Sequence, residues 1–311
     1  MTVIVKQIYD IDEISDFFVD YLAIVHNITN KEKIEQLTTD LRQKFDEGKR
    51  TVFVAYQEKS PIGFISGNNE KEVFETIAFY IKKVDNIEDC GYKLKTSLAN
   101  KAFEMGSKFY RQSITLPANF EPNLEDSLRK EGYYIYPRVG MLLQLNKEEK
   151  LVTALPENYS FEPFSMDRVD EIFQLMKEAN PPEHTDSHIY PEMLDPAKSK
   201  KIFSTFSDGF TKVDRDINPQ IIFENKLIGL SFVLAQNPEI TFVAEVCISP
   251  QHQRKGLGKA IMNKIISECA NKGYKRLGLA VTVENSGAYK LYEKLGFKIQ
   301  SKYLSISKPN K

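Results

Sequence analysis

A basic, glycine-containing turn in the second half of the chain has the residue types needed to bind an anion. The residues Gln253-Arg254-Lys255-Gly256-Leu257-Gly258 follow an apolar run that ends at Ile248 and precede apolar residues at helical spacing. The first backbone N–H groups of a helix have no partner inside the helix and lie at the positive end of its dipole, so phosphate binds there. The two glycines lack a Cβ atom and allow close approach. The segment predicts a phosphate site; the alternative is a glycine turn with solvated charges. The basic residues are Arg254, Lys255 and Lys259.

A second motif lies downstream and reads Asn285-Ser286-Gly287-Ala288-Tyr289-Lys290-Leu291-Tyr292-Glu293-Lys294-Leu295-Gly296-Phe297. One helical and one strand-like segment separate it from the glycine turn. Taken together, the two motifs closely resemble the two cofactor motifs of the GNAT superfamily of N-acetyltransferases. The resemblance covers about residues 156–307. It implies acetyl-CoA as co-substrate and transfer of the acetyl group to a primary amine.

The resemblance also implies a role for each matched residue in binding acetyl-CoA. The backbone amides of Gln253 through Lys259 would wrap the pyrophosphate. The strand before the turn would splay from its neighbour and hold the pantetheine arm at Val246 and Ile248. Asn285 would hydrogen-bond the pantetheine, although the same residue type is also a good helix N-cap. The predicted set is Val246, Ile248, Gln253, Arg254, Lys255, Gly256, Leu257, Gly258, Lys259 and Asn285.

Two side chains are candidates for proton transfer. Tyr292 matches the usual general acid of the family, which protonates the CoA thiolate; the alternative is that its ring only packs. An ammonium must lose a proton before it can act as a nucleophile, so a base or a water relay is required. Glu245 lies on the strand leading into the turn, where family members often carry a base or amine anchor. Because strand neighbours alternate faces, Glu245 could equally face away and pair with a Lys or Arg. Some members carry a glutamate where this chain has Ala280.

Other reactive side chains receive different interpretations. Cys247 lies in an apolar strand with no paired His, so core packing is favoured over nucleophilic catalysis. His184 and His188 stand four positions apart, but only two of the usual three or four metal ligands are present, and no metal is predicted. The polar stretch from Pro181 to Pro219 is expected to shape the acceptor pocket. The predicted mechanism is direct attack in a ternary complex, with the oxyanion stabilised by a backbone amide near Ile248 and no covalent enzyme intermediate.

The elements that would position these residues follow from periodicity and turn chemistry. In the second half we expect a strand at 161–164, a helix at 167–180, and three antiparallel strands between 220 and 248. A helix from 258, a strand at 276–283, a helix from 285 and a last strand at 297–306 follow. This order of strands and helices is the one the family uses. It indicates an α/β fold with a mixed sheet.

Weak internal similarity suggests that the fold occurs twice. Aligning Gly106 with Gly273 gives an offset of 167, and aligning Gly132 with Gly296 gives an offset of 164. We therefore predict tandem GNAT-like domains at 1–145 and 158–311, joined by a linker at 146–157. An unrelated α/β domain is the alternative for the first half.

The first half lacks the chemistry of the second. At these offsets Asn86, Glu88 and Asp89 replace residues of the glycine turn, and carboxylates would repel a pyrophosphate. Glu121 and Leu128 replace Asn285 and Tyr292. Residues 1–145 are therefore predicted to be degenerate and not to bind CoA. They could instead shape the acceptor site, pack against the second half or form a homodimer.

Composition restricts the remaining possibilities. The chain has 311 residues with 42 Lys and Arg against 43 Asp and Glu, so no global field favours nucleic acid or an anionic membrane. Three widely spaced cysteines indicate reduced thiols, and with no apolar leader or run of about 18 apolar residues a cytoplasmic protein is expected. The acceptor is expected to be a small-molecule or peptide amine of unspecified identity. The alternative function is a non-catalytic acyl-CoA-binding sensor or interaction module.

Overall fold

The computed structural model describes residues 2–70, 73–82, 87–116, 122–146, 154–190 and 214–310. The chain forms two compact units: Met1–Ile135 with Leu304–Lys311, and Tyr136–Tyr303. We call them unit 1 and unit 2 and describe each by itself. Most of the predicted linker, most of the Pro181–Pro219 stretch, and Asn86 and Glu121 lie outside the described residues.

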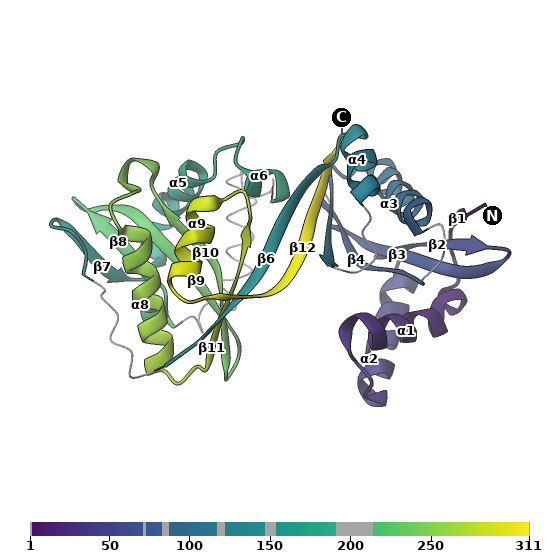
Figure 1. The fold of residues 1–311 in the computed structure, drawn as a ribbon, viewed down its shortest axis with the longest axis horizontal. Coiled ribbons are helices and arrows are strands. Elements are labelled where there is room, and N and C mark those ends of the chain that lie inside the picture. Colours follow the sequence, from purple (N-terminus) through teal and green to yellow (C-terminus); the bar gives the residue numbers. More distant parts are fainter. Residues whose placement is uncertain are drawn as a thin grey trace. The chain divides into compact units, whose positions relative to one another are not determined.

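Unit 1 is a mixed sheet with helices on both faces (Figure 1). Its sheet order is β1-β2-β3-β4-β5-β12, and β4 pairs with β5 in parallel while β1 to β4 are antiparallel neighbours. Buried side chains of α3 pack on one face, and those of α1 and α2 on the other. The elements are β1 (Ile4–Gln7), α1 (Ser15–His26), α2 (Lys31–Asp46), β2 (Arg50–Gln57), β3 (Ser60–Glu70), β4 (Val73–Ile81), α3 (Ile87–Glu104), β5 (Phe109–Leu116), α4 (Pro122–Lys130) and β12 (Lys298–Pro309).

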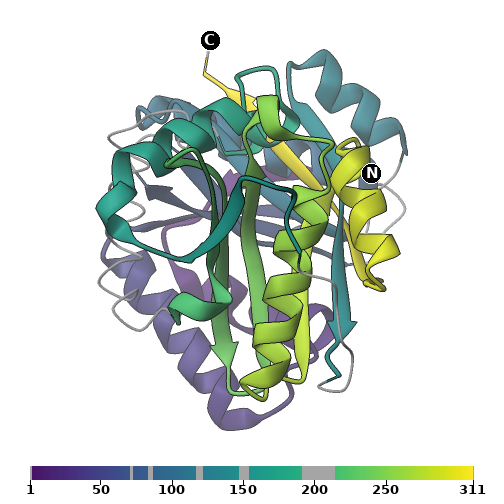
Figure 2. The same cartoon turned by 90° about the vertical axis from the view of Figure 1, so that its left-hand side faces the viewer.

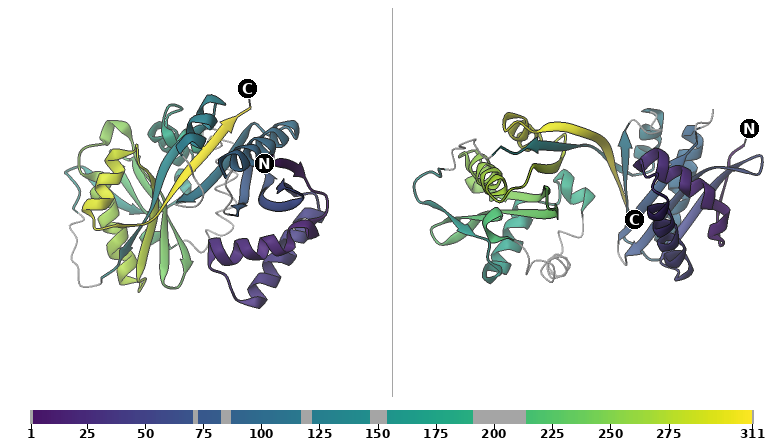
Figure 3. Two further views of the ribbon diagram at one scale, coloured as in Figure 1. Left: turned by 45° about the vertical axis from the view of Figure 1, so that its right-hand side comes forward. Right: turned by 90° about the horizontal axis from the view of Figure 1, so that it is seen from below.

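Unit 2 has the same kind of architecture. Its sheet order is β12-β6-β11-β10-β9-β8-β7, with β10 and β11 parallel. The helix α8 runs along the strands in Figure 2, and α8 and α5 lie on opposite faces of the sheet in the view from below in Figure 3. The elements are β6 (Tyr134–Gln144), β7 (Tyr159–Pro163), α5 (Val169–Ala179), α6 (Thr185–Ile189), β8 (Pro219–Phe223), β9 (Lys226–Asn237), β10 (Ile240–Ile248), α8 (Leu257–Asn271), β11 (Arg276–Thr282) and α9 (Ser286–Lys294).

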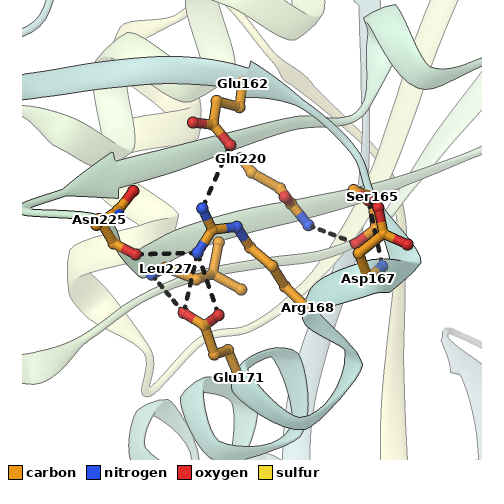
Figure 4. Close-up of polar contacts among 8 residues, drawn as sticks. All are labelled: Glu162, Ser165, Asp167, Arg168, Glu171, Gln220, Asn225 and Leu227. Carbon is orange, nitrogen blue, oxygen red and sulfur yellow. Dashed lines mark hydrogen bonds and ion pairs between the residues drawn. The ribbon is translucent and has the colours of Figure 1, made fainter.

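A polar network fixes the start of α5 against the turn between β8 and β9 (Figure 4). Arg168 Nη1 donates to Glu171 Oε1 at 3.1 Å and to the Asn225 carbonyl at 3.0 Å. Glu171 Oε2 accepts the backbone N–H of Leu227 at 2.9 Å. The network orients the helix that precedes α6, and α6 contributes a carboxylate to the site described below.

The same pattern of strand pairing occurs within each unit, at the 167-residue offset found in the sequence. The parallel pair Val73↔Phe109 in unit 1 corresponds to Ile240↔Arg276 in unit 2. Each neighbouring antiparallel pair contains a bulge, and the residues skipped are Ile77 in β4 and Ala244 in β10. A bulge locally re-aims the side chains that follow it. Repetition of both features at one offset supports a duplicated fold.

Candidate active site

The glycine turn connects β10 to α8 with a left-handed backbone. Arg254 has φ 60° and Gly256 has φ 81°, and the Gln253 side chain donates from Nε2 to the Ile248 carbonyl at 3.1 Å. The helical hydrogen bonds of α8 begin with Ala260 N–H to the Gly256 carbonyl at 3.0 Å. The amides that precede Ala260 in the first turn of α8 have no helical partner. Among the described residues, and apart from the chain neighbours of Gly256, no atom lies within 4 Å of the position that its Cβ would take, so the space beside Gly256 is open.

The strands beside this turn diverge. Parallel pairing of β10 with β11 runs from Ile240↔Arg276 to Val243↔Leu279. Beyond Val243, β10 continues along β9 as far as Ile248, while β11 continues along β6. The β10 edge that faces β11 therefore carries backbone groups outside the β10–β11 ladder at the level of Val246. Such an edge can hydrogen-bond the amides of an extended ligand arm.

The bulge at Ala244 decides which way Glu245 points. After the bulge, Ile248 belongs to the core cluster under α8, whereas Cys247 belongs to the cluster under α5. Strand alternation then places Glu245 on the same face as Cys247, the face of α5 and α6. Its side chain is partly exposed to solvent.

Glu245 has an unusual pKa for a carboxyl group. The pKa of its carboxyl group is raised to about 7; burial is the largest cause, the negative charge of Asp186 adds to the rise, and the positive charge of Arg138 opposes it. A carboxylate with a pKa near neutrality matches the requirement for a general base at physiological pH.

Tyr292 lies on α9 and is 9% exposed. Its ring packs at 5.9 Å from that of Phe297 in the cluster under α8. Burial raises the pKa of its phenol, and the charges of Glu245 and Asp186 raise the pKa further. The phenol thus stays protonated across the physiological range and interacts electrostatically with both carboxylates. Packing and proton donation are compatible in this position.

Asn285 caps α9. Its side-chain Oδ1 accepts the backbone N–H of Ala288 at 3.4 Å. This contact satisfies one of the free donors at the start of the helix.

Three site residues are not among those that the sequence motifs identify: Arg138, Asp186 and Thr282. Arg138 on β6 lies directly across from Thr282 on β11. Thr282 Oγ1 donates to Asp186 Oδ1 on α6 at 2.8 Å. The structure thus brings a guanidinium, a hydroxyl and two carboxylates from four elements of unit 2 together. No local sequence signal pointed to Arg138, because its strand is far from the motifs along the chain.

The remaining candidates have structural roles in unit 2. Cys247 is buried among apolar side chains, and burial raises the pKa of its thiol well above the usual value. The His184 ring accepts the Asp186 backbone N–H at the start of α6, and His188 Nδ1 contacts the Tyr136 hydroxyl. Within the described ranges, no group of three or more potential metal ligands is present. Nor does a described helix have the length and hydrophobicity to cross a membrane.

Comparison with known proteins places these features in a family. Residues 169–297 match the model of the acetyltransferase (GNAT) family. The ribosomal protein bS18-alanine N-acetyltransferase of Escherichia coli strain K12 is 32% identical over 84 residues, covering 27% of this chain and 56% of that protein. The L-amino acid N-acetyltransferase AaaT of the same strain is 32% identical over 74 residues, covering 23% and 46%. The chain thus spans about half the length of the curated relatives it matches.

Solved structures agree on the fold. A GCN5-related N-acetyltransferase from Sphaerobacter thermophilus aligns with a TM-score of 0.62 and 12% identity, covering 99% of this chain and 95% of that one. A tandem GNAT protein from the clavulanic acid biosynthesis pathway aligns with a TM-score of 0.57 and 12% identity, covering 99% and 98%. The predicted α/β fold with a mixed sheet is confirmed, and a tandem GNAT protein shares it.

Proposed function

The chain belongs to the GNAT family of N-acetyltransferases, and from this premise we propose that unit 2 moves the acetyl group of acetyl-CoA to a primary amine by direct attack. One observation carries the proposal. Glu245, with a pKa near 7, and Tyr292, with a protonated phenol, interact beside the diverging strands and the open glycine turn. A base, an acid and an anion-binding turn thus occur in one compact unit.

The residues present fit the co-substrate. The open turn from Gln253 to Lys259 offers backbone amides and basic side chains to a pyrophosphate. Beyond Val243 the edge of β10 that faces β11 lies outside the β10–β11 ladder, and its backbone at Val246 and Ile248 is proposed to bind the amides of pantetheine. Asn285, at the start of α9, is proposed as a further contact. Unit 1 is proposed to be a degenerate GNAT-like domain without this chemistry.

Each proton transfer has a donor and an acceptor. The substrate amine enters as an ammonium and gives a proton to the Glu245 carboxylate. The amine nitrogen forms a bond with the thioester carbonyl carbon, and a backbone amide near Ile248 stabilises the resulting oxyanion. The carbon–sulfur bond then breaks, and the Tyr292 hydroxyl protonates the departing thiolate. The nitrogen of the new amide gives up its second proton, which restores the Tyr292 phenol, and Glu245 releases its proton to solvent. The products are the acetylated amine and CoA.

The test is CoA release measured with acetyl-CoA and a panel of primary amines. We expect turnover with at least one class of amine and loss of turnover in Tyr292→Phe. Tight binding of acetyl-CoA without turnover of any amine would contradict catalysis and favour a sensor of acyl-CoA. Absence of acetyl-CoA binding would contradict the proposed site itself.

A further inference from the structure

Arg138 holds a buried guanidinium that the acetyl transfer described above does not use. The residue is 7% exposed, and its Nη1 donates to the Tyr190 hydroxyl at 3.0 Å. The guanidinium carbon lies 5.5 Å from the Tyr190 ring centroid and 5.9 Å from that of Tyr303. Within the described part of the chain, its Nε is buried without a hydrogen-bond partner.

A buried, charged N–H donor without a hydrogen-bond partner destabilises the folded state unless a ligand supplies the missing acceptor. Leaving one buried polar group unsatisfied costs about 1–3 kcal/mol, and more for a charged group. Arginine does not lose its proton in proteins, so it cannot relieve the cost by becoming neutral. One hydrogen bond to Tyr190 and the two tyrosine rings within 6 Å position the guanidinium, and within the described residues its Nε has no hydrogen-bond partner. The Nε edge of a guanidinium matches the two oxygens of a carboxylate.

The position of Arg138 ties it to the proposed reaction centre. Its cross-strand neighbour Thr282 donates to Asp186 at 2.8 Å. Tyr190, which orients the guanidinium, ends the same short helix that carries Asp186. Arg138 and Asp186 also both act electrostatically on Glu245. A cation and an acidic pair therefore stand side by side, in an arrangement that complements a zwitterion.

We propose that the acceptor of unit 2 is a small amine that also carries a carboxylate, of the amino acid class, with its carboxylate on Arg138 and its amine at Glu245 and Asp186. The inference rests on the proposed acetyl transfer and names its substrate class. Arg138 is a specificity-determining residue in this arrangement, because it binds the part of the acceptor that does not react. A diamine or polyamine, which carries no carboxylate, would instead meet an unfavourable positive charge at Arg138.

The experiment compares matched acceptors in the full-length protein by CoA release. Glycine, alanine and phenylalanine are each assayed beside the corresponding amide and the decarboxylated amine. We expect kcat/KM for the acids to exceed that for the amides by tenfold or more. In Arg138→Gln the ratio falls toward one, mainly through a higher KM for the acid, and Arg138→Lys gives an intermediate ratio. The deaminated acid should inhibit the wild type competitively and lose this effect in Arg138→Gln.

Two further variants separate recognition from folding. Arg276→Gln removes an arginine at the other end of the same pair of strands, where it pairs with Gln144 in register, and should keep the wild-type ratio. Tyr190→Phe removes the hydrogen bond to Nη1 and should lower the ratio even if Arg138→Gln does not fold. Acetyl-CoA titration of each variant reports whether unit 2 is intact.

The outcomes distinguish this inference from the proposed function. Equal turnover of acids and amides by the wild type, or an unchanged ratio in a folded Arg138→Gln, would overturn the carboxylate proposal. Turnover restricted to amines without a carboxylate would overturn it too, while leaving acetyl transfer intact. No turnover of any amine, with acetyl-CoA bound, would refute the proposed function and this inference with it.

Discussion

Replacing Glu245 with Gln should abolish most activity while making the folded protein more stable at alkaline pH. The pKa of this carboxyl rises from 4.5 to about 7, mainly through burial. At 1.36 kcal/mol for each unit, ionised Glu245 costs the folded state about 3 kcal/mol above pH 7. A group whose pKa is raised by folding stabilises the folded state fully below its unfolded pKa, near 4.5, and this contribution is lost as the pH rises through about 7.

Activity, in contrast to stability, should rise with pH. A base with a pKa of about 7 is about half ionised at pH 7 and about one-tenth ionised at pH 6. Wild-type kcat/KM should therefore rise about tenfold between pH 6 and a plateau above pH 8. Glutamine retains the shape of the side chain but accepts no proton, so E245Q should lose about 100-fold or more in kcat. Activity is measured by CoA release and stability by thermal melts, both across pH 5 to 9.

The matched control is Glu239→Gln, which alters an exposed carboxylate on the turn before β10 that pairs with Arg276 at 3.6 Å. This variant should keep wild-type activity and the wild-type dependence of melting temperature on pH. A wild-type rate that does not change between pH 6 and 8 would refute the role of Glu245. So would an E245Q protein that retains wild-type turnover, or one whose melting temperature falls relative to wild type above pH 7.

Three further substitutions test other parts of the structure. Tyr292→Phe keeps the ring packed against Phe297 and should lower kcat by about 100-fold with an unchanged melting temperature, measured by CoA release and calorimetry; unaltered kcat would mean the hydroxyl only packs. Gly256→Asp places a charged side chain at φ 81° and should weaken acetyl-CoA binding at least tenfold by titration, and unaltered binding would refute the turn as the pyrophosphate site. Lys95→Met should stabilise unit 1, because Lys95 is 1% exposed, its Nζ lacks a hydrogen-bond partner within the described residues, and burial lowers its pKa to about 7. The gain in unfolding free energy, measured by denaturant unfolding, should be greatest below pH 7, at about 2–5 kcal/mol. It should shrink toward pH 10, because a lowered lysine pKa means that the folded state disfavours the charged form. No gain at pH 6 would show that the Phe79 ring, whose centroid lies 3.5 Å from Nζ, compensates the charge.

Most of the local structure of unit 2 was predictable because its signals are local. The glycine turn, the helix from Leu257 and the strand at Arg276–Thr282 follow from turn residues and periodicity. The orientation of Glu245 was not predictable, because alternation along a strand holds only while the pairing register is unbroken. The bulge at Ala244 shifts that register by one residue, and nothing in the residue types of this segment marks the bulge.

The guanidinium of Arg138 was missed for a different reason. The predicted linker at 146–157 puts residues 134–144 in the first predicted domain, away from the two motifs. In the structure that strand pairs with β11 through Gln144↔Arg276 to Arg138↔Thr282, and the last strand continues into unit 1 at Leu304. Pairing between strands so distant along the chain depends on tertiary packing, which local periodicity does not report.

The two units have the same strand pairing but different side chains at corresponding positions. Both units keep the short parallel pairing and the bulge, which shape the sheet. Yet Ala78 follows the bulge in β4 where Glu245 follows it in β10, and Leu128, fully buried, stands where the sequence alignment places Tyr292. Unit 1 thus has buried apolar residues at the two positions that correspond to the proposed base and acid of unit 2. Because activity depends on the side chains at a site and not on the fold that carries them, repetition of the fold does not imply a second active site.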